Sequence, residues 1–327
     1  MLWLNILIFV IAVVIVTKSA DWFLGSAEKI GAYFKLPNFV MGVILIGLGT
    51  SLPELATSLA AITNGEAQIV TANILGSNIA NILIIIGIAT VVLGTIRFEK
   101  ELVDIDLPLL ATTSIMFMLL VIDGQLNWVD GLILLAGFIG YIIYSIFYRD
   151  NDENYHHGVT RLIRSVLGTR RNSESFDASG KPRLVVYATL AGSIALLAVA
   201  SQVSVGRLLA IVDQLGIGVG IVSFFALAVG TSLPELVVSI KALRQGKGDL
   251  VVGNIIGSCM FNILLIGSVS SLIAPQQLAL PGGYWMVAGL GISVFLLIVG
   301  GITRRLHIWE GAGFLLVYVA LASQIIR

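Results

Sequence analysis

The 327-residue sequence has few charged residues, one cysteine and three histidines. Only 12% of its residues are charged and 57% are hydrophobic, whereas a soluble domain carries about 25% charged residues. This shortage of charge excludes a soluble domain and predicts a polytopic membrane protein. The single cysteine, Cys259, excludes an intrachain disulfide. The formal net charge is zero, which gives no general attraction to nucleic acid.

The three histidines, His156, His157 and His307, all fall in predicted connections between apolar segments or at the edge of one. A membrane-buried Ser–His pair for nucleophilic catalysis is therefore excluded. We expect a protein that is not an enzyme and that carries no cofactor.

The apolar residues gather into runs that are long enough to cross a membrane. About 30 Å of hydrocarbon requires about 20 helical residues. The predicted fold class is an all-α integral membrane protein with ten transmembrane helices. The ten runs lie at residues 2–22, 38–62, 67–93, 103–122, 126–148, 183–211, 217–241, 248–274, 283–303 and 307–326.

The basic residues are divided unequally between the two sides of this predicted bundle. Of the 19 Lys and Arg residues, all but Arg207 and Arg327 fall in or beside connections that face one side. Positive charge collects on the cytoplasmic side of membrane proteins. We therefore expect both termini outside, the central loop in the cytoplasm, and the cell membrane as the location.

Two motifs occur twice in the sequence. GTSLPEL at 49–55 returns at 230–236, and NILGSNIANIL at 73–83 returns as NIIGSCMFNIL at 254–264. The shift from 49 to 230 equals the shift from 73 to 254, and we call this constant shift the repeat offset. One offset shared by two motifs indicates a duplicated unit of five spans. Because five is an odd number, the second unit enters the membrane upside down, as in many secondary transporters.

The repeat divides the chain into a first five-helix repeat at 1–148, a cytoplasmic linker at 149–182 and an inverted second repeat at 183–327. Within the first repeat, Pro53 removes a backbone N–H and clashes with the preceding turn. We expect broken helices in spans two, three, seven and eight around a central cation site, because interrupted helices expose groups that coordinate ions. Gly76 and Gly257 predict a close approach of spans three and eight.

Two glutamates lie deep inside predicted spans, Glu54 in the second and Glu235 in the seventh. An isolated ionised side chain at this depth costs about 3 kcal/mol or more. No Lys or Arg lies deep enough in the predicted spans to pair with either glutamate. This pattern favours a bound cation or a proton as the partner, and protonated structural glutamates are the alternative.

Hydroxyl and amide side chains accompany both glutamates at helical spacing. Sites built only from oxygen atoms suit Ca²⁺ and other hard cations. A Ser/Asn stripe can equally form hydrogen bonds between helices, and for Asn73 and Asn254 both interpretations stay open. The candidate donors are Thr50, Ser51, Asn73, Ser77 and Asn81 in the first repeat and Thr231, Ser232, Asn254, Ser258 and Asn262 in the second.

At these residues the sequence resembles the calcium/cation antiporter superfamily, and specifically the prokaryotic Na⁺/Ca²⁺ exchangers. GTSLPEL with GSNIANI is similar to the first alpha repeat of that family, and GTSLPEL with GSCMFNI is similar to the second. The resemblance implies a secondary active antiporter that exchanges Na⁺ for Ca²⁺ by alternating access and extrudes Ca²⁺. An antiporter of H⁺ against Ca²⁺ or another divalent cation at the same site is the alternative. We expect a monomer whose partners are Ca²⁺, Na⁺ and lipid, with H⁺ under the alternative.

The resemblance also implies roles for individual residues. Glu54 and Glu235 would be the central carboxylates shared between Ca²⁺ and Na⁺, and spans one and six would slide as a mobile pair across the other eight. Asn262 stands where potassium-dependent relatives carry Asp, which disfavours potassium dependence, and Cys259 stands where the first copy has Asn78. The other residues expected to line the cation sites are Thr50, Ser51, Ser77, Asn81, Thr231, Ser232, Ser258 and Asn262, with Gly47 and Ala228 offering backbone carbonyls.

Overall fold

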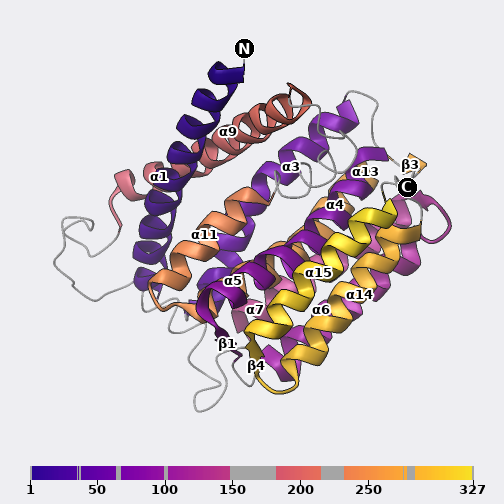
Figure 1. The fold of residues 1–327 in the computed structure, drawn as a ribbon. Coiled ribbons are helices and arrows are strands. Elements are labelled where there is room, and N and C mark those ends of the chain that lie inside the picture. The colour runs from indigo at the N-terminus through magenta and orange to yellow at the C-terminus, as the bar shows by residue number, and fades with distance from the viewer. Residues whose placement is uncertain are drawn as a thin grey trace.

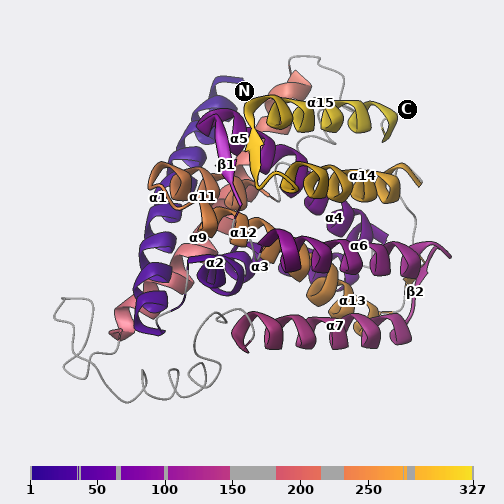
Figure 2. The same ribbon diagram turned by 90° about the horizontal axis from the view of Figure 1, so that it is seen from below.

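The longest helices of the protein form a pair at one side of the molecule. The structure, a computed structural model, describes residues 2–34, 36, 38–63, 68–98, 102–147, 182–214, 232–274, 276–277 and 284–325. Helices α1 (Leu2–Phe34) and α9 (Leu184–Gln214) pack against each other along their length. Figures 1 and 2 show this pair beside the remaining helices. Many of its apolar side chains are exposed, which suits contact with lipid.

The helices that carry the repeated motifs form the centre of the molecule. The most deeply buried of the apolar spans are Val70–Leu93 and Leu250–Ile273. Helices that are apolar on all faces are typically surrounded by other helices. The central elements are α2 (Asn38–Met41), η1 (Gly42–Gly47), α3 (Leu48–Thr63), α4 (Gln68–Ala80), η2 (Asn81–Ile86), α5 (Gly87–Leu93), α11 (Leu233–Arg244), α12 (Gly248–Met260), η4 (Phe261–Ile266) and α13 (Gly267–Ile273), where η denotes π-helix.

The predicted breaks in spans two, three and eight are wrong, because these helices continue and widen locally into π-helix. The second span is helical throughout 38–63, with η1 before the motif and Pro53 inside α3. A proline costs a helix about 3 kcal/mol, and packing against neighbouring helices lets membrane helices tolerate it. Such π turns are frequent at functional sites. The break predicted for span seven falls beside 215–231, which lies outside the described residues; α11 begins at Leu233.

Four outer helices and two short sheets complete the described fold. The connections of the two halves pair with each other, since β1 (Thr95–Arg97) is antiparallel to β4 (Arg305–His307) and β2 (Gln125–Leu126) is antiparallel to β3 (Gln276–Gln277). Figure 1 shows β1 and β4 at one end of the helices and β3 at the other. The outer helices are α6 (Leu107–Val121), which follows η3 (Leu102–Asp106), α7 (Trp128–Phe147), α14 (Tyr284–Gly301) and α15 (Ile308–Ile325).

The chain is a multi-pass membrane protein. Among the described residues, seven helices are long and apolar enough to cross a membrane, and two shorter apolar helices lie at Gly42–Ala56 and Ile308–Gln324. The total of ten spans stays a prediction. The predicted linker at 149–182 lies outside the described residues except for its last position.

Two helices approach each other at glycines, but not the pair that the sequence predicts. A Cβ atom added to Gly257 would lie 2.8 Å from Val43 Cα, so α12 packs backbone to backbone against η1 of the second span. Gly47 faces α12 in the same way, with Ser258 N at 3.1 Å from the added atom. A Cβ atom added to Gly76 would meet, among the described residues, only the side chain of Met286, at 3.7 Å. Spans three and eight do contact each other, as the hydrogen bond from Asn262 Nδ2 to Asn78 Oδ1 shows, but the predicted approach through Gly76 is wrong.

Candidate cation site

The two deep glutamates lie at the centre of the described helices. Glu54 is on α3 and Glu235 is in the first turn of α11, with 1% and 0% of their surfaces exposed. Their carboxylates are near enough to repel each other electrostatically. None of the four carboxylate oxygens has a hydrogen-bond partner among the described residues. Two buried like charges without partners are costly, so this arrangement requires a cation or protons.

A cluster of oxygen atoms from both halves lies beside the glutamates. Thr50 Oγ1 is 3.3 Å from Ser258 Oγ and 3.2 Å from Asn254 Oδ1, and it is also 3.0 Å from the Ile46 carbonyl oxygen. Ser258 Oγ donates to the Gly47 carbonyl at 3.3 Å. A single hydroxyl proton cannot satisfy several acceptors at once, so the cluster keeps lone pairs that a cation can use.

The hydroxyls of this cluster extend to the second glutamate. Thr50 and Ser258 lie close enough to the Glu235 carboxylate to interact with it, although neither completes a hydrogen bond with it. Thr50 comes from the motif of the first repeat, whereas Ser258 and Glu235 come from the second. The close packing of α12 on η1 described above brings Thr50 and Ser258 together.

Asn73 and Asn254 both form hydrogen bonds between helices. Asn73 Nδ2 donates to Ser58 Oγ at 3.3 Å, and Asn254 Nδ2 donates to Ser239 Oγ at 3.1 Å. Asn254 differs from Asn73 because its Oδ1 also faces Thr50. The sequence analysis missed Ser58 and Ser239, which are fully buried. The repeat offset relates these two serines, so it was the signal that could have found them.

The remaining predicted ligands are buried where the structure describes them. Ser51, Ser77, Asn81, Ser232 and Asn262 are each at most 3% exposed. The hydroxyls of Ser51 and Ser232 have no hydrogen-bond partner within the described ranges. The same is true of Nδ2 and Oδ1 of Asn81 and of Oδ1 of Asn262. The last of the predicted ligands, Thr231 and Ala228, lie outside the described residues.

The chemistry of the site is that of hard oxygen ligands. It contains two carboxylates with neutral hydroxyl, amide and carbonyl oxygens around them. No cluster of three or more His, Cys, Asp or Glu residues occurs in the described part of the chain. Such a donor set suits Ca²⁺ or Na⁺ better than a soft or strongly chelated transition metal.

Comparisons with known proteins agree with this chemistry. A family model described as sodium/calcium exchanger protein matches residues 4–147 and 185–326. The chain is 30% identical over 349 residues to the sodium/calcium exchanger MaX1 of Methanosarcina acetivorans, with 98% of each chain covered. It is 30% identical over 271 residues to the inner membrane protein YrbG of Escherichia coli, with 83% of this chain and 80% of the relative covered. The solved structure of the sodium-calcium exchanger NCX_Mj matches at a TM-score of 0.76 and 26% identity, covering 98% of each chain.

Proposed function

The chain belongs to the sodium/calcium exchanger protein family, and from that premise we propose that it exchanges Na⁺ for Ca²⁺ by alternating access and extrudes Ca²⁺. The family makes it a transporter and not an enzyme, and supports cation/Ca²⁺ antiport. One observation carries the proposal. Glu54 and Glu235 are buried close to each other, and neither has a hydrogen-bond partner in the described residues.

Charge balance at the site supports coupled exchange of Na⁺ for Ca²⁺ and disfavours uncoupled movement of either ion. When ionised, the two carboxylates carry two negative charges, which one Ca²⁺ or two Na⁺ neutralise. Since both ions use the same oxygens, full loading with both at once is disfavoured. A Na⁺ gradient can then drive Ca²⁺ out, and any Na⁺ beyond two adds a charge that moves through the membrane potential at about 2.3 kcal/mol per 100 mV.

The oxygen cluster supports named ligands for these cations. In this proposal Glu54 and Glu235 are the central ligands, and Thr50, Ser258 and the Gly47 carbonyl surround them, as their mutual contacts favour. The other proposed ligands are Ser51, Ser77, Asn81, Ser232 and Asn262, together with Thr231 and the carbonyl of Ala228.

The proposed architecture is ten spans in two inverted repeats. It is supported by elements that recur at the repeat offset to within a residue, such as α4 with α12 and η2 with η4. The sheets support it as well, because the same offset carries β1 onto β3 and β2 onto β4, and so exchanges the two strand pairs. Both termini would lie outside and the linker in the cytoplasm. The α1–α9 pair would slide over the rest, which fits its packing mainly against itself.

The test is a flux measurement on the full chain reconstituted in vesicles. With Na⁺ loaded inside and radioactive Ca²⁺ outside, we expect uptake that requires the outward Na⁺ gradient and stops when a Na⁺ ionophore removes it. Glu54→Gln should abolish this uptake. The control is Asp123→Asn, which also neutralises an acid but at an exposed turn outside the proposed site, and it should leave the uptake unchanged.

The rival coupling gives a different result in the same vesicles. An H⁺/Ca²⁺ antiporter would take up Ca²⁺ without Na⁺ and would change the internal pH during uptake, as an internal pH dye reports. Ca²⁺ uptake that is indifferent to Na⁺ and linked to pH would therefore contradict the proposed coupling while leaving the cation site in place.

A further inference from the structure

Asn78 and Cys259 occupy equivalent positions of the two motif copies, related by the repeat offset. Each lies beside an asparagine of the opposite repeat, Asn78 beside Asn262 and Cys259 beside Asn81. We infer that Asn78 is a positioning residue, which holds the Asn262 amide with its oxygen available to the cation. Cys259 is its weaker counterpart at Asn81. The inference rests on the proposed function and deepens it.

The contact between Asn262 and Asn78 is a direct hydrogen bond. Asn262 Nδ2 donates to Asn78 Oδ1 at 3.3 Å, and both side chains are buried. Asn262 Oδ1 has no partner among the described residues. Asn78 Nδ2 likewise has no partner among the described residues. Because an amide has donors at one end and an acceptor at the other, the bond in this arrangement, with Asn78 Oδ1 as the acceptor, leaves the Asn262 oxygen available to a cation. A turned amide would present its NH₂ group to the cation and remove the ligand.

The equivalent contact in the other repeat has a thiol in place of the amide oxygen. The repeat offset converts the Asn78–Asn262 pair into the pair Cys259–Asn81, and Cys259 is indeed beside the Asn81 side chain. Within the described ranges, neither amide atom of Asn81 meets hydrogen-bond geometry with any partner. Sulfur is a weak acceptor, so the orientation of the Asn81 amide is held less firmly.

The two asparagine oxygens are therefore unequal ligands, although the residues themselves are repeated. The Asn262 oxygen is oriented before the cation arrives, whereas the Asn81 amide must be ordered when it binds. Partners that orient a ligand typically change metal affinity by about 10–100-fold when they are removed. A bond that served stability alone would leave the affinity unchanged, and this difference makes the inference testable.

The experiment exchanges the two side chains and measures equilibrium Ca²⁺ binding to the purified full chain. Asn78→Cys should weaken Ca²⁺ binding by about 10-fold, the low end of the range for ligand-orienting partners, and Cys259→Asn should strengthen it. Thr71→Val is the matched control: Thr71 is buried on the same helix as Asn78, and Val252 is its equivalent at the repeat offset. Like Asn78→Cys, this control introduces the residue that the other repeat carries at the equivalent position, and it should bind Ca²⁺ like the parent.

A second background shows whether Asn78 acts through Asn262. In Asn262→Asp the two carboxylate oxygens are equivalent, so no turned state exists and Asn78→Cys should weaken Ca²⁺ binding clearly less than it does in the parent. An equal loss in both backgrounds, or no loss in the parent, would overturn the inference. Thermal unfolding without Ca²⁺ separates a folding defect from an affinity defect. If instead Glu54→Gln and Glu235→Gln bind Ca²⁺ normally, the proposed function itself fails.

Discussion

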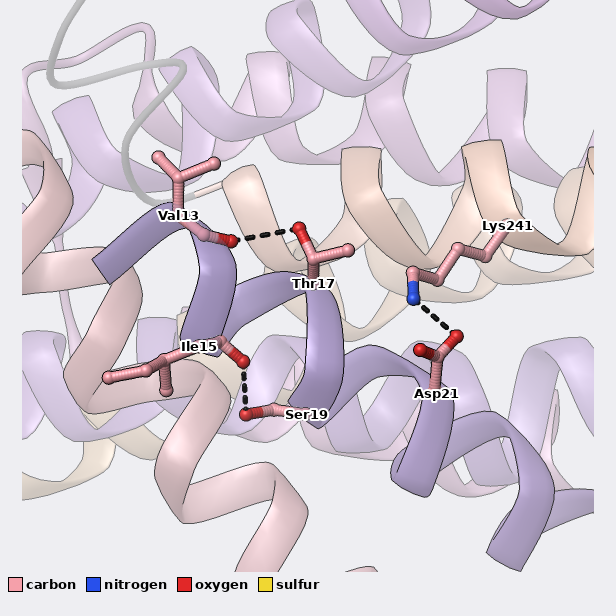
Figure 3. A network of polar contacts seen from close by, with 6 residues as sticks. All are labelled: Val13, Ile15, Thr17, Ser19, Asp21 and Lys241. Atoms are coloured by element: carbon pink, nitrogen blue, oxygen red, sulfur yellow. Dashed lines mark hydrogen bonds and ion pairs between the residues drawn. The ribbon is translucent and has the colours of Figure 1, made fainter. Parts of the chain in front are cut away.

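The acids of α3 and α11 and the acids of α1 lie in opposite surroundings. Glu54 and Glu235 are fully buried and have no partner in the described residues, whereas Asp21 and Glu28 are partly exposed and form ion pairs with Lys241 and Lys247. Figure 3 shows Lys241 directed at Asp21 on α1. Solvated ion pairs contribute little, but unpaired buried acids are costly and are kept for function.

One helix contains both situations. On α11, Lys241 follows Glu235 by less than two turns, which places it about 9 Å further along the helix axis and on a different face. The lysine forms an ion pair with Asp21 of α1, so it joins the α1–α9 pair to the centre and does not compensate the charge of Glu235. Proximity in sequence to a basic residue therefore does not neutralise a buried acid; helix geometry decides which residues meet.

The largest expected effect is the loss of exchange when either deep acid is neutralised. Glu54→Gln or Glu235→Gln should reduce Na⁺-driven Ca²⁺ uptake by more than about 100-fold, which corresponds to about 2.7 kcal/mol of lost cation stabilisation. Asp21→Asn should retain uptake within a few fold. Uptake in vesicles measures both, and an equal loss in all three variants would remove the functional contrast between the two groups of acids.

Stabilisation of the folded protein by Ca²⁺ should depend on the buried glutamates and not on the acids of α1. Ca²⁺ at about 100 times its Kd should stabilise the parent protein by about 2.7 kcal/mol, because it binds only the folded state. Glu235→Gln should lose this stabilisation, and Glu28→Gln should keep it. Thermal unfolding with and without Ca²⁺ provides the measurement. A Ca²⁺-dependent shift that persists in Glu235→Gln would place the cation elsewhere.

A smaller effect should separate the two buried asparagines. Asn254→Ala removes the bond to Ser239 and the contact with Thr50, whereas Asn73→Ala removes only the bond to Ser58. Each should lower the free energy of unfolding by about 1–3 kcal/mol, because a buried partner is left unsatisfied. Only Asn254→Ala should also weaken Ca²⁺ binding. Equal binding by both variants would show that the Thr50 contact is irrelevant to the cation.

The smallest expected effect comes from the ion pairs of α1. Lys241→Ala should change the free energy of unfolding by no more than about 1 kcal/mol, since Asp21 is half exposed and its charge is screened. The change should shrink further in high salt. Chemical denaturation at two salt concentrations provides the measurement, and a salt-independent loss of several kcal/mol would show that this ion pair is structural.

Part of the site was predictable because its signals are local. Glu54 and Glu235 stand out as acids inside apolar runs, and the exact repetition of GTSLPEL marks both. Ser58 and Ser239 were missed because a serine in a membrane helix is ordinary until its partner is known. The contact of Gly257 with Val43 was also missed, since spacing along one helix does not identify the facing helix.

The amino-acid sequence by itself determined the membrane environment, the repeat and the positions of the two costly acids, because composition and periodicity act within single segments. Tertiary structure decided which polar groups pair and which stay available. Packing of α12 on η1 brings Thr50 to Ser258. The helices of the second, third and eighth spans continue through π turns where the sequence predicted breaks. These outcomes depend on contacts between residues from opposite halves of the chain, which no local pattern specifies.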